Sequence, residues 1–558
     1  MNEVIYRFVW YPICTAFQKM SLSQLKSWIS LNKLVLILIT VYFLISIIKI
    51  EHPGVNNDQL MFINAATIKE ENYFLWKSFH GIPTMIFPYI GALKSYLYLP
   101  IFYIFGVNIW SIRLPHIIII SISLFLLYKT LILSFNKKIA LLTILLLAFD
   151  PSQVIYSKID TGPTVLEFFL KVLTIYLFSL FVKTKQRMIF LSIYPILFLG
   201  IFNKINFFWF VNAFMFSSLL LYGRNFYNNF KSLGRFVPLI LIVIPYFALL
   251  RFFIKLSRET VLSYRNFSNE ISLDNLLVNF PIFYKNLTEV INGNLFFNIA
   301  YGYNPTIFGT AFSFLLISLL FLGMFIILVR ESKFIKPYIF VTLITILISL
   351  QILLTKRAIS AWHFLAVYPF FTIIFAAGIF HLYTIVKSKI IKKMIIVLIC
   401  LIVVYQLQVN FLYINKYSQP TKSVALSSTI YDLINYTKIN HSKFVCLDAD
   451  ICNQLLSFDQ EKNKYFEPFS FLDSSTYRDS FARIVGNFNK PDKFLYIAHS
   501  GINSHFPALK LGFFKFLKDS DVEFIKIQEF TDGNNIIFEI YRVGYALNPQ
   551  IRTLDRIN

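Results

Sequence analysis

Long apolar segments separated by short polar connections dominate the first three quarters of the sequence. A helix that crosses a bilayer needs about 20 mostly apolar residues, and apolar runs of that length predict such helices. We predict about eleven spans, at 33–50, 112–134, 139–156, 161–182, 188–203, 206–222, 236–255, 306–329, 337–354, 362–385 and 393–414. Residues 1–32 are expected to lie at the interface. The first run lacks a small-residue cleavage site, so we expect no cleavable signal peptide.

The segment 91–106 decides the topology, because every later loop changes sides if it crosses the membrane. It is apolar but short, and it contains Lys94 and Pro100. If it does not cross, nearly all the dense basic clusters fall on one side, which the positive-inside rule identifies as the cytoplasm. The clusters are Lys137/Lys138, Lys183/Lys185/Arg187, Arg224/Lys231/Arg235, Arg330/Lys333/Lys336 and Lys387/Lys389/Lys392/Lys393. We therefore predict a cytoplasmic N-terminus and an inner-membrane protein, with the first loop (51–111), the loop 256–305 and the C-terminal residues outside.

Beyond residue 415 the apolar runs become short. Phe444–Leu447 and Phe494–Ala498 are typical of buried strands, and Val522–Phe530 and Ile536–Val543 alternate around Thr-Asp-Gly-Asn-Asn, a hairpin signal. The chain is therefore predicted to be mainly α, with a polytopic membrane bundle (1–415) and a small soluble extracytoplasmic α/β domain (416–558). Cys446 and Cys452 fall in this domain, either as a disulfide or as two unrelated thiols.

Composition supports this division and argues against nucleic-acid binding. The chain is 57% hydrophobic with a mean hydropathy of +0.63, and only 15% of its residues are charged. Its net charge is +23, but residues 416–558 hold 17 basic and 16 acidic residues, whereas residues 1–415 hold 35 and 13. The excess positive charge therefore lies among the apolar segments, where it sets topology. No basic face or nucleic-acid motif of the usual kinds is present.

Two acidic residues lie at the predicted outer face. Asp58 follows the first span, and a carboxylate that can reach an acceptor hydroxyl or amine suits a general base. The alternative is an N-cap for the run 59–71, since Asp is a preferred cap. Asp160 lies at the outer junction of two spans, where charged residues are usually functional. It too has a capping alternative, with Pro163 in the first helical turn.

Several cations fall on the same face, at the ends of different spans. They are Arg113, Lys204 and the pair Lys356/Arg357, with His363 following shortly after. Each cation by itself could be a side chain that only reaches to the interface. Together with the two acids they could hold a phosphate leaving group and activate a nucleophile.

The order of these features resembles the GT-C membrane glycosyltransferases, in particular the protein O-mannosyltransferase and aminoarabinose transferase group (glycosyltransferase family 39-like). Those proteins have an acid in the first outer loop, then a helix ending in Phe-Gly, an Arg-Leu opening the next span, a second acid, a Lys turn and a late Arg/His turn before Tyr-Pro. The matching residues here are Asp58, Phe105-Gly106, Arg113-Leu114, Asp160, Lys204, and Arg357 through His363 to Tyr368-Pro369. Where the family often pairs two acids, this chain has Asp58 followed by Gln59, and Lys94 lies in the short helix.

By this resemblance the chain would transfer a sugar from a polyprenyl-phosphate donor to a lipid, glycan or protein acceptor, with inversion. Asp58 would be the general base, and Asp160 would orient a cation or help to hold a metal. Lys94, Arg113, Lys204, Lys356 and Arg357 would contact the donor phosphate, with Gln59 and His363 as further candidates. Whether a divalent metal takes part is open, because no histidine cluster accompanies the two acids. The competing hypotheses are a transporter or lipid flippase, a polysaccharide polymerase or ligase, and a structural scaffold.

Overall fold

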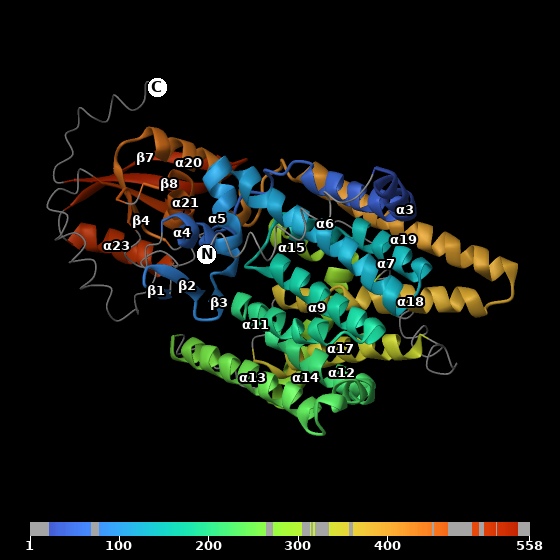
Figure 1. Cartoon of the computed structure of the whole chain (residues 1–558). Helices are drawn as coiled ribbons and strands as arrows, with labels where there is room; N and C mark the ends of the chain where they lie inside the picture. The colour runs from blue at the N-terminus through green and yellow to red at the C-terminus, as the bar shows by residue number, and fades with distance from the viewer. Residues whose placement is uncertain are drawn as a thin grey trace.

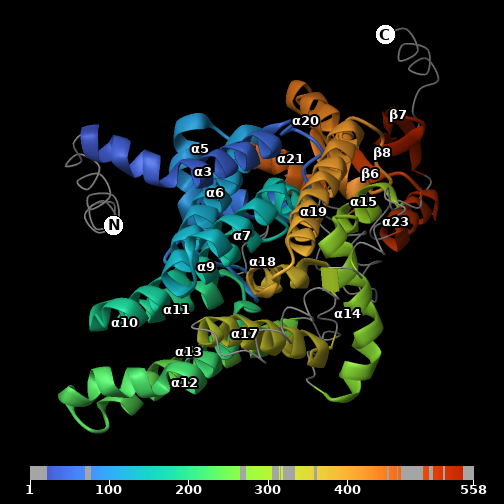
Figure 2. The same ribbon diagram turned by 90° about the vertical axis from the view of Figure 1, so that its right-hand side faces the viewer.

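A helical bundle with a small mixed sheet at one end forms the core of the computed structural model (Figure 1). Figure 2 shows α5, α20 and α21 at one end of the molecule and α12 and α17 at the other. The structure describes residues 22–68, 77–263, 272–303, 313, 316–317, 334–356, 361–448, 451–461, 463–466, 494–501, 507–519 and 522–544.

Apolar helices make up the bundle, and each span predicted within the described residues coincides with one helical segment or two consecutive ones. The segments are α3 (Leu22–Ile47), α6 (Ile109–Ser134), α7 (Lys137–Phe149), α8 (Pro151–Lys158), α9 (Thr164–Thr184), α10 (Arg187–Leu191), α11 (Ile193–Asn203), α12 (Phe207–Phe230), η2 (Lys231–Leu233), α13 (Val237–Ser263), α17 (Ile335–Leu354), η3 (Ala361–Val367), α18 (Phe370–Ile385) and α19 (Lys389–Lys416).

Within this described part, six helices are long and apolar enough to cross a membrane alone. The pair α7 and α8, bent by 61°, adds a seventh span if it crosses as one. Of the other predicted spans, 188–203 and 362–385 correspond to shorter apolar helices. The span 206–222 falls in α12, which has 24 residues but is not among the six, and 306–329 lies almost wholly outside the described residues.

The first predicted outer loop forms a compact unit rather than a span. It contains α4 (Asn57–Thr67), β1 (Lys77–Phe79), β2 (Ile82–Phe87), β3 (Ile90–Gly91) and α5 (Leu93–Phe105). Helix α5 has 13 residues, a length of about 20 Å that is shorter than the apolar core of a bilayer. Helix α7, also of 13 residues, lies within a predicted span, so the non-spanning position of 91–106 stays a prediction. The second predicted outer loop contains α14 (Asp274–Asn292) and α15 (Leu295–Tyr301).

The C-terminal domain is α/β, as predicted. Its elements are η4 (Val424–Leu426), α20 (Thr429–Ile439), β4 (Lys443–Cys446), α21 (Ile451–Asp459), β5 (Tyr465–Phe466), β6 (Phe494–His499), α23 (Pro507–Asp519), β7 (Glu523–Asp532) and β8 (Asn535–Gly544). The sheet order is β5-β4-β6-β8-β7, with β4 parallel to β5 and β6. The predicted hairpin is β7–β8, and Gly533 in its turn has a φ of 62°. Cys446 and Cys452 form a disulfide.

The first loop and the C-terminal domain share one hydrophobic core. Leu60 and Ile63 of α4 and Tyr98 of α5 pack in the same cluster as Leu433 and Leu455 of the domain. Figure 1 shows α4 and α5 between the domain and the bundle. The backbones also touch: the Gly54 amide donates to the Leu426 carbonyl at 2.8 Å, and a Cβ on Gly54 would lie 2.0 Å from the Ser427 carbonyl oxygen. The C-terminal domain therefore packs directly against the first loop.

Candidate active site

Asp58 lies in the first turn of α4, but it is not the residue that caps this helix. The N-cap is Asn56, whose side-chain oxygen accepts from the Gln59 amide at 3.0 Å. The capping alternative for Asp58 is therefore wrong in detail, because the helix begins two residues earlier than 59. The half-buried Asp58 carboxyl group is left available for other interactions.

Asp160 occupies the turn between α8 and α9 and is fully buried. One carboxylate oxygen, Oδ2, accepts from the ammonium group of Lys94 at 2.8 Å, and the His116 ring lies 3.5 Å from the same atom. The other, Oδ1, accepts from the Thr164 hydroxyl at 2.6 Å and from the Val165 amide at 3.0 Å. The N-cap position of α9 is Pro163, so Asp160 is not the cap residue; its carboxylate instead satisfies one backbone amide of the first turn and pairs with a cation.

Lys94, near the start of α5, is 2% exposed. Its ammonium group lies 4.4 Å from the ring centre of Phe62 and 5.6 Å from that of Tyr98, so the aromatic faces add to the Asp160 ion pair. Burial lowers the pKa of Lys94, and the nearby Asp160 carboxylate opposes that effect. For Asp160, burial would raise the pKa, but Lys94, His116 and the hydrogen bonds outweigh it and hold the pKa below its usual range.

Lys204 reaches the Asp160 turn from the opposite direction. It ends α11, and its ammonium nitrogen lies 3.5 Å from the point where a Cβ on Gly162 would stand. Gly162 has a φ of 72°. Because glycine has no side chain, this part of the turn presents only backbone to the Lys204 ammonium group. Among the described residues the Lys204 ammonium group has no hydrogen bond or ion pair. The site therefore holds one cation that is already paired, Lys94, and one that is not, Lys204.

The charge state of Asp58 depends on these neighbours. Burial raises the pKa of the Asp58 carboxyl group; the positive charge of Lys204 lowers it, Asp160 raises it further and Lys94 lowers it. The net effect is a pKa above the ordinary aspartate value. A carboxylate with a raised pKa is a stronger base than a free one, which suits proton abstraction near neutral pH.

Arg113 has other partners than the phosphate contact expected from the sequence. It is fully buried at the start of α6 and donates to the Ile50 carbonyl at 2.7 Å and the Gly54 carbonyl at 3.2 Å. It also donates to the Gln59 side-chain oxygen at 3.1 Å. In this arrangement Arg113 holds the first loop, because its guanidinium group donates to two oxygen atoms of that loop and to the Ile50 carbonyl just before it.

Lys158 is a site residue that sequence reasoning missed, although it stands two positions before Asp160. Its buried ammonium group donates to the Ile48 carbonyl at 2.7 Å, and its own carbonyl accepts from the Gln59 amide group at 3.0 Å. A lysine in the last turn of a predicted helix, two residues before an acid, was the sequence signal that could have identified it. Lys158 and Arg113 together attach the Gln59 side chain to the bundle.

The late basic turn is only partly described. Lys356 follows α17 and is half-buried, whereas Arg357 lies outside the described residues. His363 lies in η3, where its ring meets Trp209 edge to face at 5.5 Å. Lys171 of α9 positions this segment by donating to the Leu365 and Ala366 carbonyls at 2.8 and 3.0 Å. The expected phosphate contacts of Lys356 and Arg357 therefore remain predictions.

Buried polar atoms without partners occur in the two turns that carry Asp160 and Lys204. Within the described residues they include the Thr161 hydroxyl and the side-chain oxygens of Asn203 and Asn206. Buried polar atoms are normally satisfied, so each such atom calls for an explanation, and a polar ligand is one. No group of three or more His, Cys, Asp or Glu able to hold a metal ion occurs in the described part of the chain.

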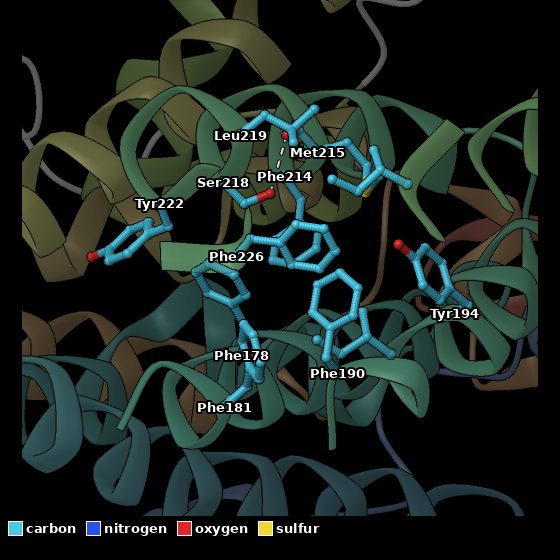
Figure 3. Close-up of a pocket in the computed structure, with 12 residues that line it drawn as sticks. Phe178, Phe181, Phe190, Tyr194, Phe214, Met215, Ser218, Leu219, Tyr222 and Phe226 are labelled. Carbon is cyan, nitrogen blue, oxygen red and sulfur yellow. Dashed lines mark hydrogen bonds between the residues drawn. The ribbon is translucent and has the colours of Figure 1, made fainter. Parts of the chain in front are cut away.

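A cavity elsewhere in the bundle is not a substrate site. Phe178 and Phe181 of α9, Phe190 of α10 and Phe214 of α12 line it (Figure 3). Its volume of about 20 Å³ has room for about one water molecule. Its walls are almost wholly apolar, and its one drawn hydrogen bond runs from the Ser218 hydroxyl to the Met215 carbonyl. We interpret it as a gap in aromatic packing.

Comparison with known proteins agrees with this architecture. Residues 92–248 match the family model described as dolichyl-phosphate-mannose-protein mannosyltransferase. The structure of ArnT from Cupriavidus metallidurans in the apo state is similar, with a TM-score of 0.55, 9% identity and coverage of 92% of this chain and 98% of ArnT. ArnT from the same organism bound to undecaprenyl phosphate gives a TM-score of 0.51, 11% identity and the same coverage. No curated protein sequence gives a significant match.

These likenesses span nearly the full length of both chains, so they include the bundle and the C-terminal domain. At such low identity the solved structures establish the fold, and the family match covers the segment that carries Lys94, Arg113, Asp160 and Lys204. The fold expected from the sequence resemblance is confirmed: the chain has the fold of ArnT, and its residues 92–248 resemble the dolichyl-phosphate-mannose-protein mannosyltransferases.

Proposed function

We propose that this chain transfers a sugar from a polyprenyl-phosphate donor to an acceptor hydroxyl or amine, with Asp58 as the general base. The observation that carries the proposal is the placement of Asp58 among Lys204, Lys94 and Asp160, with one cation unpaired. A carboxylate of raised pKa next to a free ammonium group matches the needs of proton abstraction and phosphate departure at adjacent points. ArnT, which has the same fold, has been seen with undecaprenyl phosphate bound.

The proposed reaction is a single displacement. The oxygen or nitrogen of the acceptor bonds to the anomeric carbon, and Asp58 takes the proton that this atom loses. The bond between that carbon and the phosphate oxygen breaks, and the electron pair leaves with polyprenyl phosphate. Because attack and departure occur on opposite faces of the sugar, the anomeric configuration inverts. Lys204 meets the charge on the leaving phosphate, and Lys356 and Arg357 are proposed to join it.

Two further residues are assigned positioning roles in this proposal. Arg113 keeps the first loop folded through its hydrogen bonds to the Ile50 and Gly54 carbonyls. Asp160 holds Lys94 at the wall of the site and anchors the start of α9.

The site is proposed to face the extracytoplasmic side. The predicted topology puts the basic clusters in loops at the opposite ends of the spans, and positive loops stay in the cytoplasm. The disulfide between Cys446 and Cys452 suits an oxidising compartment. The C-terminal domain shares a core with the first loop, so domain and site lie on the same side.

The test uses purified protein in proteoliposomes with a panel of labelled undecaprenyl-phosphate sugars and candidate acceptors. We expect one donor to be consumed, with release of undecaprenyl phosphate, and no consumption by Asp58→Asn. The matched control is Asp274→Asn, because Asp274 is an exposed acid in the first turn of α14 and should not matter. Movement of an intact donor across the bilayer without consumption would instead support a flippase and overturn the proposal.

A further inference from the structure

Three consecutive side chains at the start of α4 point in different directions. Successive residues of an α-helix are rotated by about 100°, so Asn57 and Gln59 project to opposite sides of the helix with Asp58 between them. The direction of the Asp58 carboxyl group is therefore set by whatever holds Asn57 on one side and Gln59 on the other.

The bundle holds the Gln59 side. The Gln59 amide group donates to the Lys158 carbonyl at 3.0 Å, and its oxygen accepts from Arg113 at 3.1 Å. Gln59 is 1% exposed, so these bonds form away from water and are costly to lose.

The C-terminal domain holds the other side through one residue, Asn453 of α21. The Asn64 amide group donates to the Asn453 side-chain oxygen, and the Asn453 amide group donates to the Asn57 side-chain oxygen. Asn57 and Asn64 are seven residues apart and thus lie on one face of α4, two turns from each other. Asn64 and Asn453 are both fully buried. One amide therefore bridges both ends of the helix that carries Asp58.

The bridging helix is itself firmly attached. Cys452, which precedes Asn453, forms the disulfide with Cys446 at the end of β4. The Ser457 hydroxyl donates to the Asn453 carbonyl at 2.7 Å. Figure 1 shows α21 beside α4, and Leu455 of α21 packs in the same cluster as Leu60 of α4. The sheet domain thus presents Asn453 to α4 at a defined position.

We propose that Asn453 is a positioning residue for the transfer reaction: it fixes the rotation of α4 so that the Asp58 carboxyl group faces Lys204 and Asp160. The inference rests on the proposed role of Asp58 as the general base. It makes the soluble domain a part of the catalytic apparatus, because a residue about 400 positions from Asp58 in the sequence sets the direction of the base. A base displaced by about 1 Å loses on the order of 100-fold in rate.

The test compares Asn453→Ala with Gln454→Ala in the full-length protein in proteoliposomes. Gln454 is also a buried amide in α21, but among the described contacts it has no hydrogen bond to α4. Two quantities are measured: hydrogen exchange of the α4 peptide, residues 57–67, and kcat and KM with the donor that the wild-type protein consumes. Asn57→Ala removes the bridge to the first turn, and it is the second variant should Asn453→Ala fail to fold.

For Asn453→Ala we expect exchange in α4 to be about tenfold faster and kcat to fall by about 10- to 100-fold, with KM for the donor within twofold of wild type. Gln454→Ala should resemble wild type in both measurements. An unchanged kcat in Asn453→Ala, or a loss that appears only in KM, would overturn the inference. If Asp58→Asn keeps full turnover, it is the proposed function that fails, and the exchange data still show whether Asn453 holds α4.

Discussion

If the Lys94 ammonium group is removed while the length of its side chain is kept, the free energy of unfolding should fall. The fall reports how unfavourable the buried Asp160 carboxylate is without its cation. Lys94→Met is the appropriate change, because methionine is apolar and flexible enough to lie between Phe62 and Tyr98. The variant leaves Asp160 with the Thr164 hydroxyl and Val165 amide as donors and the His116 ring 3.5 Å away, but without its lysine partner.

The magnitude follows from the geometry of the pair. At the observed 2.8 Å, an effective dielectric constant of about 20 gives an attraction of about 6 kcal/mol. Part of this offsets the desolvation of both groups, and breaking one partner of a buried pair typically costs about 3–5 kcal/mol. We expect the free energy of unfolding of Lys94→Met to be about 3–5 kcal/mol lower than that of the wild type at pH 8.

The loss should depend on pH, because Asp160 can escape the cost by binding a proton. In the variant, burial without Lys94 should raise the folded-state pKa of Asp160 above its unfolded value of about 3.9. Between those two values the folded state holds a proton that the unfolded state lacks, so stability falls by about 1.4 kcal/mol per pH unit as pH rises. In the wild type the pKa of Asp160 is lowered, so its contribution is fully present above pH 4 and constant from pH 5 to 8.

The assay is the free energy of unfolding from denaturant titration in detergent micelles at several pH values between 5 and 8. Asp160→Asn combined with Lys94→Met should restore most of the stability, because a neutral amide needs no cation. Lys49→Met is the control: the Lys49 ammonium group donates to the Ser418 hydroxyl at 2.8 Å, so its removal leaves no buried carboxylate behind and should cost less. A loss in Lys94→Met that is the same at pH 5 and pH 8, or that Asp160→Asn does not relieve, would refute the reasoning.

Three further predictions concern the base, its neighbour and the topology. Asp58→Asn should abolish transfer in the donor-consumption assay while α4 keeps its hydrogen-exchange protection, because Asn56 is the cap; near-normal turnover would exclude Asp58 as the base. Lys204→Gln should move the ascending limb of the pH–rate profile to higher pH, because the positive charge of Lys204 lowers the pKa of Asp58; a shift to lower pH would contradict this placement. Periplasmic reporters fused after residue 420 and residue 558 should be active and cytoplasmic ones inactive, and the reverse pattern would mean that 91–106 crosses the membrane.

The architecture could be predicted from local patterns. Apolar runs marked the long helices that the structure describes, and alternation marked the β7–β8 hairpin. These features are readable because the hydrophobic effect acts on each segment separately, whatever its neighbours are. The ordered acids and cations also pointed to the correct fold group.

The partners of the site residues could not be predicted in this way. Nothing near Arg113 in the sequence indicates that its guanidinium group is occupied by loop carbonyls, and nothing near Asp58 indicates that Asn56 caps the helix. Lys94 was expected to contact phosphate, but in the structure its ammonium group meets Asp160, 66 positions away in the chain. A charged side chain at a helix end fits several roles equally well, and the nearest opposite charge decides among them.

The sequence by itself determines which type of residue stands at each site position and whether that position is near the end of a helix, since both can be read from the pattern around it. The direction of each side chain and the identity of its partner depend on how α4, α5, α8, α11 and α21 pack together. Asn453 illustrates the difference, because in the sequence it is one polar residue in a short helix of a soluble domain. Only the folded chain brings it to Asn57 and Asn64, where burial makes each amide hydrogen bond necessary and so fixes the helix that carries Asp58.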